Sequence, residues 1–148
     1  MPESWFYHLE GSTVQSVLPG LLEKIRARGW QALVKCMPDD ISELDEFLWT
    51  YKDGSFLPHG RDDEPQSEQQ PVLLTTKSSS AEKAQCVILL DGLSLDDMTG
   101  VERCIIIING RNADQVSSER KRWKALSDQG HSMSYFQQDE RGAWVKKA

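Results

Sequence analysis

Four cations surround one tryptophan in the run Arg120-Lys121-Arg122-Trp123-Lys124. If this run is helical, one stripe collects the residues at helical spacing, namely Val116, Arg120, Trp123 and Ser127, with Lys124 beside it. A guanidinium beside an indole suits a ligand with a carboxylate and an adjacent apolar or aromatic group. The Arg fork binds a carboxylate in bidentate fashion, and the indole supplies flat apolar area. Spacing alone also allows a second interpretation, in which Trp123 is a core residue and the cations are solvated.

A second aromatic region lies between residues 49 and 59. Trp49 falls one step off the apolar face of the helix predicted over residues 41–51, and Phe56-Leu57-Pro58 form an apolar island in the polar segment 52–71. Exposed aromatics at such places are typical anchors of protein interfaces. The alternative is that the segment folds back and buries Phe56 against the sheet. A polar segment of this length in a small domain is either functional or mobile.

Enzyme and cofactor chemistry find little support in the sequence. It contains no glycine-rich dinucleotide fingerprint and no P-loop motif for phosphate. Asp91 and Asn109 end apolar strands, where catalytic groups often lie, but each precedes a glycine and is equally typical of a turn. The three histidines lack metal-ligand spacing, so we expect no metal, no cofactor and no catalytic residue. The cysteines all fall in predicted strands and are expected to be buried: Cys36, Cys86 and Cys104.

The elements that must position these groups alternate between strands and helices. Apolar runs predict strands over residues 5–9, 30–36, 72–76, 86–90, 101–108 and 133–138, and helical periodicity predicts helices over 14–28, 41–51 and 113–129. Pro19 predicts that the first helix either starts there or is kinked there, and Asp39-Asp40 supplies the cap of the second. The nearly continuous apolar strands predict an α/β fold, a single-domain, Rossmann-like open sheet that is mostly parallel with helices on both faces.

Length indicates the number of domains, and the distribution of charge indicates the kind of partner. The 148 residues fit one domain over 1–148, and the net charge is −6. Residues 39–68 hold ten acidic against two basic residues, whereas residues 103–148 hold nine basic against five acidic ones. This pattern favours a local site for an anionic partner over general nucleic-acid binding. No apolar run is long enough for a membrane span and the N-terminus lacks signal-peptide features, so we expect a cytoplasmic protein.

The chain resembles the chi subunit of bacterial DNA polymerase III along nearly its whole length, most closely chi sequences of alphaproteobacterial type. The resemblance rests on short motifs in family order: Phe6-Tyr7-His8-Leu9, Leu18-Pro19, Leu21-Leu22-Glu23-Lys24, Arg28-Gly29-Trp30, Leu44-Asp45, Leu48-Trp49-Thr50-Tyr51, Ser55-Phe56-Leu57-Pro58-His59-Gly60, Gln70-Pro71-Val72-Leu73-Leu74-Thr75-Thr76, Arg122-Trp123-Lys124 and Gly130-His131. Each motif alone is weak, but their combination in this order is specific.

The resemblance implies a non-catalytic accessory subunit of the clamp-loader complex. Such a subunit links the replicase to single-stranded-DNA-binding protein and contacts DNA only indirectly. Chi proteins hold that protein's flexible acidic tail, which ends in Pro-Phe and a free carboxylate. The family's tail-binding residues correspond here to Arg120, Trp123 and Trp49. A basic residue of the family falls on Val116 in this chain, and Lys121 or Lys124 is the candidate to replace its charge.

The resemblance also implies a second partner, the psi subunit or an equivalent clamp-loader protein, at the surface around Phe56-Leu57-Pro58-His59. Two other hypotheses stay open on the residues alone. One is a nucleotide-binding enzyme that uses Asp91 and Asn109, although the phosphate loop is missing. The other is direct binding of single-stranded DNA by Trp123 and the basic helix, against which the net charge of −6 argues.

Overall fold

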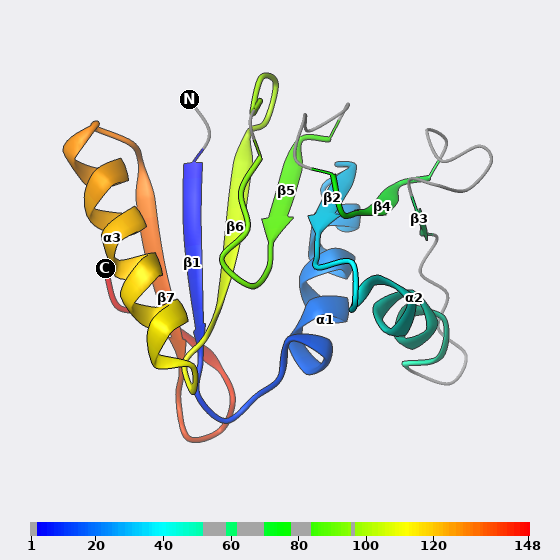
Figure 1. The fold of residues 1–148 in the computed structure, drawn as a ribbon, viewed down its shortest axis with the longest axis horizontal. Helices are drawn as coiled ribbons and strands as arrows, with labels where there is room; N and C mark the ends of the chain where they lie inside the picture. Colours follow the sequence, from blue (N-terminus) through cyan, green and yellow to red (C-terminus); the bar gives the residue numbers. More distant parts are fainter. Residues whose placement is uncertain (1–2, 52–58, 62–69, 78–83, 96) are drawn as a thin grey trace.

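The computed structural model describes residues 3–51, 59–61, 70–77, 84–95 and 97–148. The strands are β1 (Glu3–Leu9), β2 (Ala32–Lys35), β3 (Gly60–Arg61), β4 (Val72–Thr75), β5 (Cys86–Leu89), β6 (Arg103–Asn109), β7 (Met133–Gln138) and β8 (Trp144–Lys146). They form one sheet in the order β3-β4-β2-β5-β6-β1-β7-β8 (Figure 1). All paired strands are parallel except β7 and β8, which are antiparallel.

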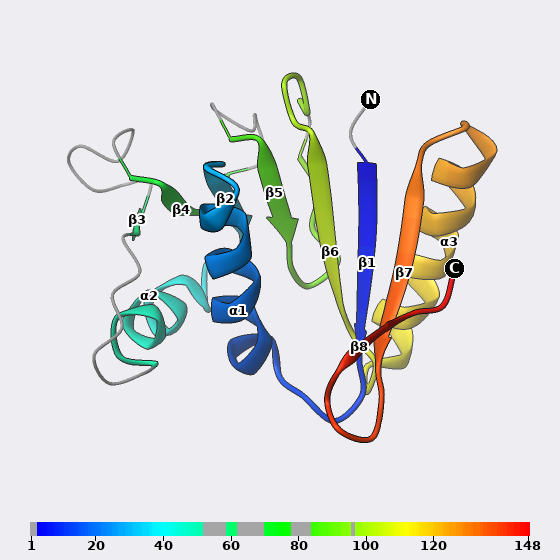
Figure 2. The same cartoon turned by 180° about the vertical axis from the view of Figure 1, so that it is seen from behind.

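Helices cover both faces of this sheet. The helices are α1 (Val14–Ala27), α2 (Ile41–Thr50) and α3 (Ala113–Asp128). α1 and α2 pack on one face, seen from the front in Figure 2, around a core that includes Tyr7, Leu22 and Leu48. α3 packs on the other face, over a core that includes Phe6 and Ile106. The predicted α/β class, with a mostly parallel open sheet of Rossmann-like type, is confirmed.

The start of α1 shows how local polar contacts set a helix boundary. Thr13 caps the helix: its Oγ1 accepts the N–H of Ser16, and the N–H of Thr13 donates to Ser16 Oγ, both at 3.1 Å. The helix therefore begins at Val14 and contains the buried Pro19, so a start at Pro19 is wrong. It ends before Gly29, whose φ of +78° is the left-handed conformation that glycine favours, as the sequence predicted.

α2 begins where the sequence predicts, but the predicted cap does not form. Asp40 occupies the N-cap position, yet its side chain makes no hydrogen bond to the helix. Burial, followed by the charge and hydrogen bond of Asp40, raises the pKa of Asp91 above its ordinary value. The buried positions of the helix, Ile41, Leu44 and Leu48, are those that the apolar spacing predicts.

The sequence pattern misses the two edge strands. β3 has two residues within the segment 52–71, which is therefore not one continuous loop. β8 returns along β7 after a turn in which Asp139 Oδ1 accepts the N–H groups of Arg141 and Ala143 at 2.8 and 3.0 Å. Strands of two or three residues are too short to show alternating burial. The other strands and the three helices lie within two residues of their predicted bounds.

Candidate anion-binding site on α3

The helix that carries the basic run is defined at both ends. The side chain of Asn112 caps it by accepting the N–H of Gln115 at 3.1 Å, and the helix continues from Ala113 to Asp128. Gly130 follows with a φ of +81°, which allows the chain to turn back into β7. The basic run thus occupies the middle of a four-turn helix, so its side chains project from a regular scaffold.

Trp123 packs on an aromatic floor built by β1 and β7. The register of these strands places Phe6 beside Tyr135, and both rings lie under α3. The Trp123 ring meets Phe6 at 5.2 Å and Tyr135 at 5.6 Å between centroids, at interplanar angles of 74° and 85°. Such edge-to-face pairs are favourable. Trp123 is half-buried, as is Val116 on the same core, so the indole is anchored in the core and also reaches the surface.

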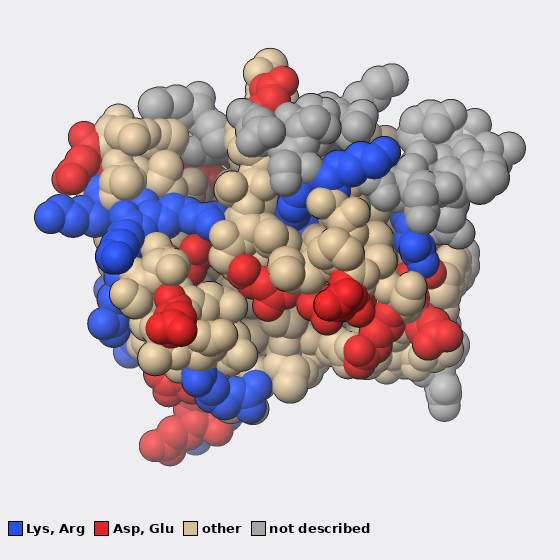
Figure 3. Space-filling model, in the orientation of Figure 1, with Lys and Arg blue, Asp and Glu red and all other residues tan. Residues whose placement is uncertain are grey.

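Three cations of the basic run have no internal partner. Arg120, Lys121 and Lys124 are exposed, and within the described part of the chain none of them forms an ion pair or a side-chain hydrogen bond. Figure 3 shows Lys and Arg side chains gathered over α3 at the left, whereas acidic side chains dominate over α2 at the lower right. This flank of α3 is therefore a cationic surface beside an anchored aromatic ring.

Arg122 is the exception among the four cations. Its Nη2 donates to the carbonyl oxygens of Gly92 and Leu93, both at 3.0 Å, and lies 3.2 Å from Glu119 Oε1. Glu119 is 2% exposed, and burial raises the pKa of its carboxyl while Arg122 opposes that shift. Arg122 thus holds the loop after β5 against α3 and is not free to bind a partner. Sequence reasoning missed this pair, although an acidic residue three positions before an arginine is a helical pairing signal.

The two flanks of α3 therefore differ. On the Arg122 flank a cavity of about 340 Å³ opens between α3, β5 and β6, with Leu89, Ile106 and Leu126 in its wall. Its cation is already engaged with Glu119 and two carbonyl groups. On the other flank the free guanidinium of Arg120 lies near polar groups of β1 and β7.

A small polar cluster faces Arg120. His8 is 8% exposed, and its Nδ1 lies 2.5 Å from the hydroxyl of Tyr135. Its Nε2 lies 4.0 Å from Glu10 Oε1. Burial lowers the pKa of His8, while the charge of Glu10 raises it and that of Arg120 lowers it. Burial raises the pKa of Tyr135, which Arg120 lowers and Glu10 raises. The charges of Glu10 and Arg120 therefore act on both His8 and Tyr135.

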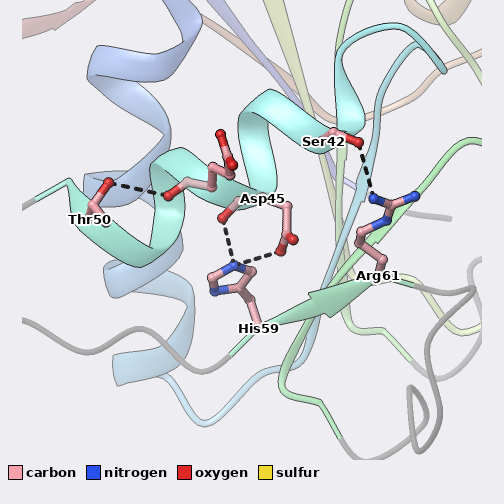
Figure 4. Close-up of polar contacts among 6 residues, drawn as sticks. Ser42, Asp45, Thr50, His59 and Arg61 are labelled. Atoms are coloured by element: carbon pink, nitrogen blue, oxygen red, sulfur yellow. Dashed lines mark hydrogen bonds and ion pairs between the residues drawn. The ribbon is translucent and has the colours of Figure 1, made fainter.

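The region around α2 is built differently. His59 is 2% exposed, and its Nε2 lies 3.0 Å from Asp45 Oδ1 and 3.1 Å from the Asp45 carbonyl oxygen (Figure 4). The ring of Trp49 lies over it, with 4.1 Å between centroids, and Trp49 is 48% exposed. Nearby, Arg61 Nη1 donates to Ser42 Oγ at 3.1 Å. His59, predicted as part of a partner surface, is buried beneath the Trp49 ring, whereas Phe56, Leu57 and Pro58 lie outside the described residues.

Trp49 does not join the α3 site. It lies on α2, which packs beside β4 on the α1 face of the sheet, whereas Trp123 lies on α3, beside β6 on the opposite face. Three other strands separate β4 from β1 in the sheet order. The structure thus brings Val116, Arg120, Trp123 and the neighbouring lysines together on α3, and it places Trp49 over His59 at the other side of the sheet.

The strand ends considered for catalysis have turn geometry. Asn109 Oδ1 accepts the N–H of Arg111 at 3.1 Å, and Asp91 has a φ of +53° in the turn before Gly92. The three cysteines are buried as predicted, and burial raises the pKa of Cys86 and of Cys104 to about 12. Among the described residues, no group of three His, Cys, Asp or Glu side chains is arranged to hold a metal. Searched over the same residues, none of the helices is long and apolar enough to span a membrane.

Comparison with known sequences connects this architecture to DNA replication. A probable DNA polymerase III subunit chi from Rickettsia prowazekii (strain Madrid E) is 22% identical over 156 residues, a match that covers 100% of this chain and 93% of that protein. The family described as "DNA polymerase III chi subunit, HolC" matches residues 1–134, which include all three helices and the candidate site on α3. The chain therefore belongs to the family of DNA polymerase III chi subunits.

Proposed function

We propose that this chain is a non-catalytic replisome subunit that links DNA polymerase III to single-stranded-DNA-binding protein by holding its acidic C-terminal tail on α3. The observation that carries the proposal is a set of three exposed cations beside Trp123, which form no ion pair or side-chain hydrogen bond with any residue that the structure describes. A ligand of opposite charge completes such a surface, because cations left unpaired by the fold remain available to it.

In this proposal the cations bind the charged groups of the tail, and apolar side chains bind its terminal Phe. Arg120 receives the terminal carboxylate of the tail, since its guanidinium is free whereas that of Arg122 is engaged within the chain. The exposed part of Trp123 and the neighbouring Val116 receive the terminal Phe side chain. Lys121 and Lys124 face the acidic residues that precede it. This arrangement replaces the family's basic residue at the position of Val116 with lysines farther along the helix.

A second contact is proposed at the opposite end of the sheet. There the psi subunit, or an equivalent clamp-loader protein, would bind the surface around Trp49 and the segment Phe56-Leu57-Pro58. Trp49 supports this assignment because it is the exposed aromatic nearest to that segment in the chain. His59 and Asp45 hold the indole from below. In this proposal Trp49 leaves the tail site, to which the resemblance alone had assigned it.

The tail site is tested by fluorescence anisotropy of a labelled acidic peptide that ends in Pro-Phe with a free carboxylate. A short tail buries little area, so we expect micromolar affinity, about −8 kcal/mol. A matched peptide without the final Phe should bind much more weakly. Because the contacts are charged and exposed, raising the salt concentration should weaken binding. A labelled oligothymidine in the same assay distinguishes this function from direct binding of single-stranded DNA, which would give a steep salt dependence with the nucleic acid.

The matched variants are Arg120→Ala and Lys24→Ala. Lys24 is exposed on α1, on the face of the sheet opposite to α3, so its loss changes the net charge equally without touching the site. Arg120→Ala should weaken peptide binding about tenfold or more, the effect of one charge-assisted hydrogen bond, while Lys24→Ala should bind as the unmodified protein does. Equal affinities for the two variants would contradict the assignment of Arg120.

A further inference from the structure

The cluster that faces Arg120 has a consequence for the tail site, and this inference rests on the function proposed above. We propose that His8 is a second anion-binding group of that site, and that the terminal carboxylate of the acidic tail binds between Arg120 and a protonated His8. Tail binding is then coupled to the uptake of one proton. The tail is held more tightly as the pH falls toward the acid side of neutrality.

The fold brings four groups to this point from different elements. His8 is the last residue but one of β1, Tyr135 comes from β7, and Arg120 comes from α3. Glu10 follows β1 directly and is largely exposed. Gly110, which follows β6 directly, packs against His8, because a Cβ atom at Gly110 would overlap the Leu9 carbonyl oxygen and His8 Nε2. These are the titratable and charged groups that face His8, together with the backbone that positions it.

The hydrogen bond between His8 and Tyr135 accommodates both protonation states of the imidazole. Burial keeps Tyr135 protonated, so its hydroxyl can donate to a neutral Nδ1. In that tautomer the proton of the ring is on Nε2, the atom that lies toward Glu10. When the ring gains a second proton, the same hydroxyl oxygen can accept from Nδ1. The Tyr135 hydroxyl therefore supports His8 in either state and leaves Nε2 as the donor to an anion.

The unliganded site keeps His8 neutral near pH 7. Burial lowers the pKa of His8 below its ordinary value of 6.5; the nearby charge of Glu10 raises this pKa and that of Arg120 lowers it further. A carboxylate that binds beside Nε2 would offset the charge of Arg120 and raise the pKa of His8. A group whose pKa is raised in the complex stabilises that complex as the pH falls through the raised value, and the gain ends below the pKa of the free protein.

The first measurement is the affinity of the labelled Pro-Phe peptide between pH 8.0 and pH 5.5, a range in which the carboxylates of the peptide stay ionised. We expect binding about three- to tenfold tighter at pH 5.5 than at pH 8.0, the effect of a pKa change of up to about one unit. His8→Gln keeps a polar side chain opposite Tyr135 but cannot titrate, so its affinity should vary little with pH. Glu10→Gln removes a competing carboxylate and should strengthen binding at pH 8.0 by about two- to threefold.

A second measurement uses the unmodified protein, so that its result does not depend on whether a variant folds. The NMR titration of the three histidines gives the pKa of His8 directly, with His131→Gln to assign the signals. The peptide should raise the pKa of His8. If the peptide binds and depends on Arg120, but the pKa of His8 does not move and affinity is flat with pH, His8 has no part in the site and the proposed function survives. If the unmodified protein binds no peptide at any pH, both proposals fail.

Discussion

Charged side chains are paired within the fold at the α2 end of the sheet and exposed to solvent at the α3 end. At the α2 end, Asp45 is paired with a buried His59, and Arg61 is bonded to Ser42. At the α3 end, Arg120 and the two neighbouring lysines project without internal partners. The aromatic residues show the reverse pattern, because Trp49 is exposed at the α2 end, whereas Trp123 is packed into the core at the α3 end.

This contrast suggests two kinds of recognition on one sheet. At the α2 end the paired charges hold the local structure in place. The exposed indole of Trp49 above them offers apolar area to a folded partner. Charges left free beside a half-buried indole offer directional contacts to a flexible anionic segment. Two different surfaces on opposite faces of the sheet are what the linking role proposed above requires. Three pairs of variants test this contrast through their free energies of unfolding.

The largest expected difference is between the two tryptophans. Trp123→Ala should lower the free energy of unfolding by about 3 kcal/mol, since it removes the ring that packs on Phe6 and Tyr135. Trp49→Ala should lower it by less than about 1 kcal/mol, because almost half of that side chain is already exposed. Urea unfolding at pH 7 measures both values. Similar losses would show that Trp49 is a structural residue and would remove it as an interface anchor.

A smaller effect is expected from the buried histidine. His59→Ala should cost about 2 kcal/mol of unfolding free energy, because it leaves a cavity under Trp49 and removes the donor from the Asp45 carboxylate and carbonyl. The matched change at the same end of the sheet is Ser42→Ala on α2, which removes an exposed hydrogen bond and should cost less than about 0.5 kcal/mol. Were the two variants equally stable, the Asp45–His59 pair would not be what holds this end together.

The smallest expected difference separates the two arginines of α3. Arg122→Ala should cost about 1–2 kcal/mol at pH 7, because two carbonyl groups and the buried Glu119 lose their partner. Arg120→Ala should leave stability unchanged. Burial already holds the pKa of Glu119 above its ordinary value. The cost of Arg122→Ala should therefore shrink as the pH falls from 8 to 5 and Glu119 takes up a proton. An equal cost at both pH values would mean that Glu119 does not change its protonation state over this range.

Local patterns were sufficient for most of the fold. Apolar runs and helical spacing place the six longer strands and the three helices, because each of those elements has enough residues to show its period. β3 and β8 could not be found in this way, since their pairing depends on neighbouring strands. Helical spacing also places the start of α1 at Val14, and the reciprocal Thr13–Ser16 cap shows why the helix does not start at Pro19 instead.

The candidate site was only partly predictable, for a related reason. Spacing places Val116, Arg120 and Trp123 on one stripe, and the structure agrees. Spacing cannot show which arginine is hydrogen-bonded within the fold, because the partners of Arg122 include carbonyl groups about thirty residues earlier in the chain. It also cannot bring His8 and Tyr135 to Arg120, since those contacts depend on the register of β1 with β7. The separation of Trp49 from Trp123 depends on the order of the strands, which neither spacing nor the resemblance shows.

The short edge strands limit how other chains can approach this sheet. β3 contributes two residues and β8 three, and β8 ends in a lysine. A long unpaired strand would let an extended peptide add to the sheet through backbone hydrogen bonds, a mode that is tolerant of sequence and prone to aggregation. Edges this short offer little template for such addition. A tail that binds here must be recognised by the side chains of α3, so its selection depends on charge and on its terminal residue and not on a general capacity to form a strand.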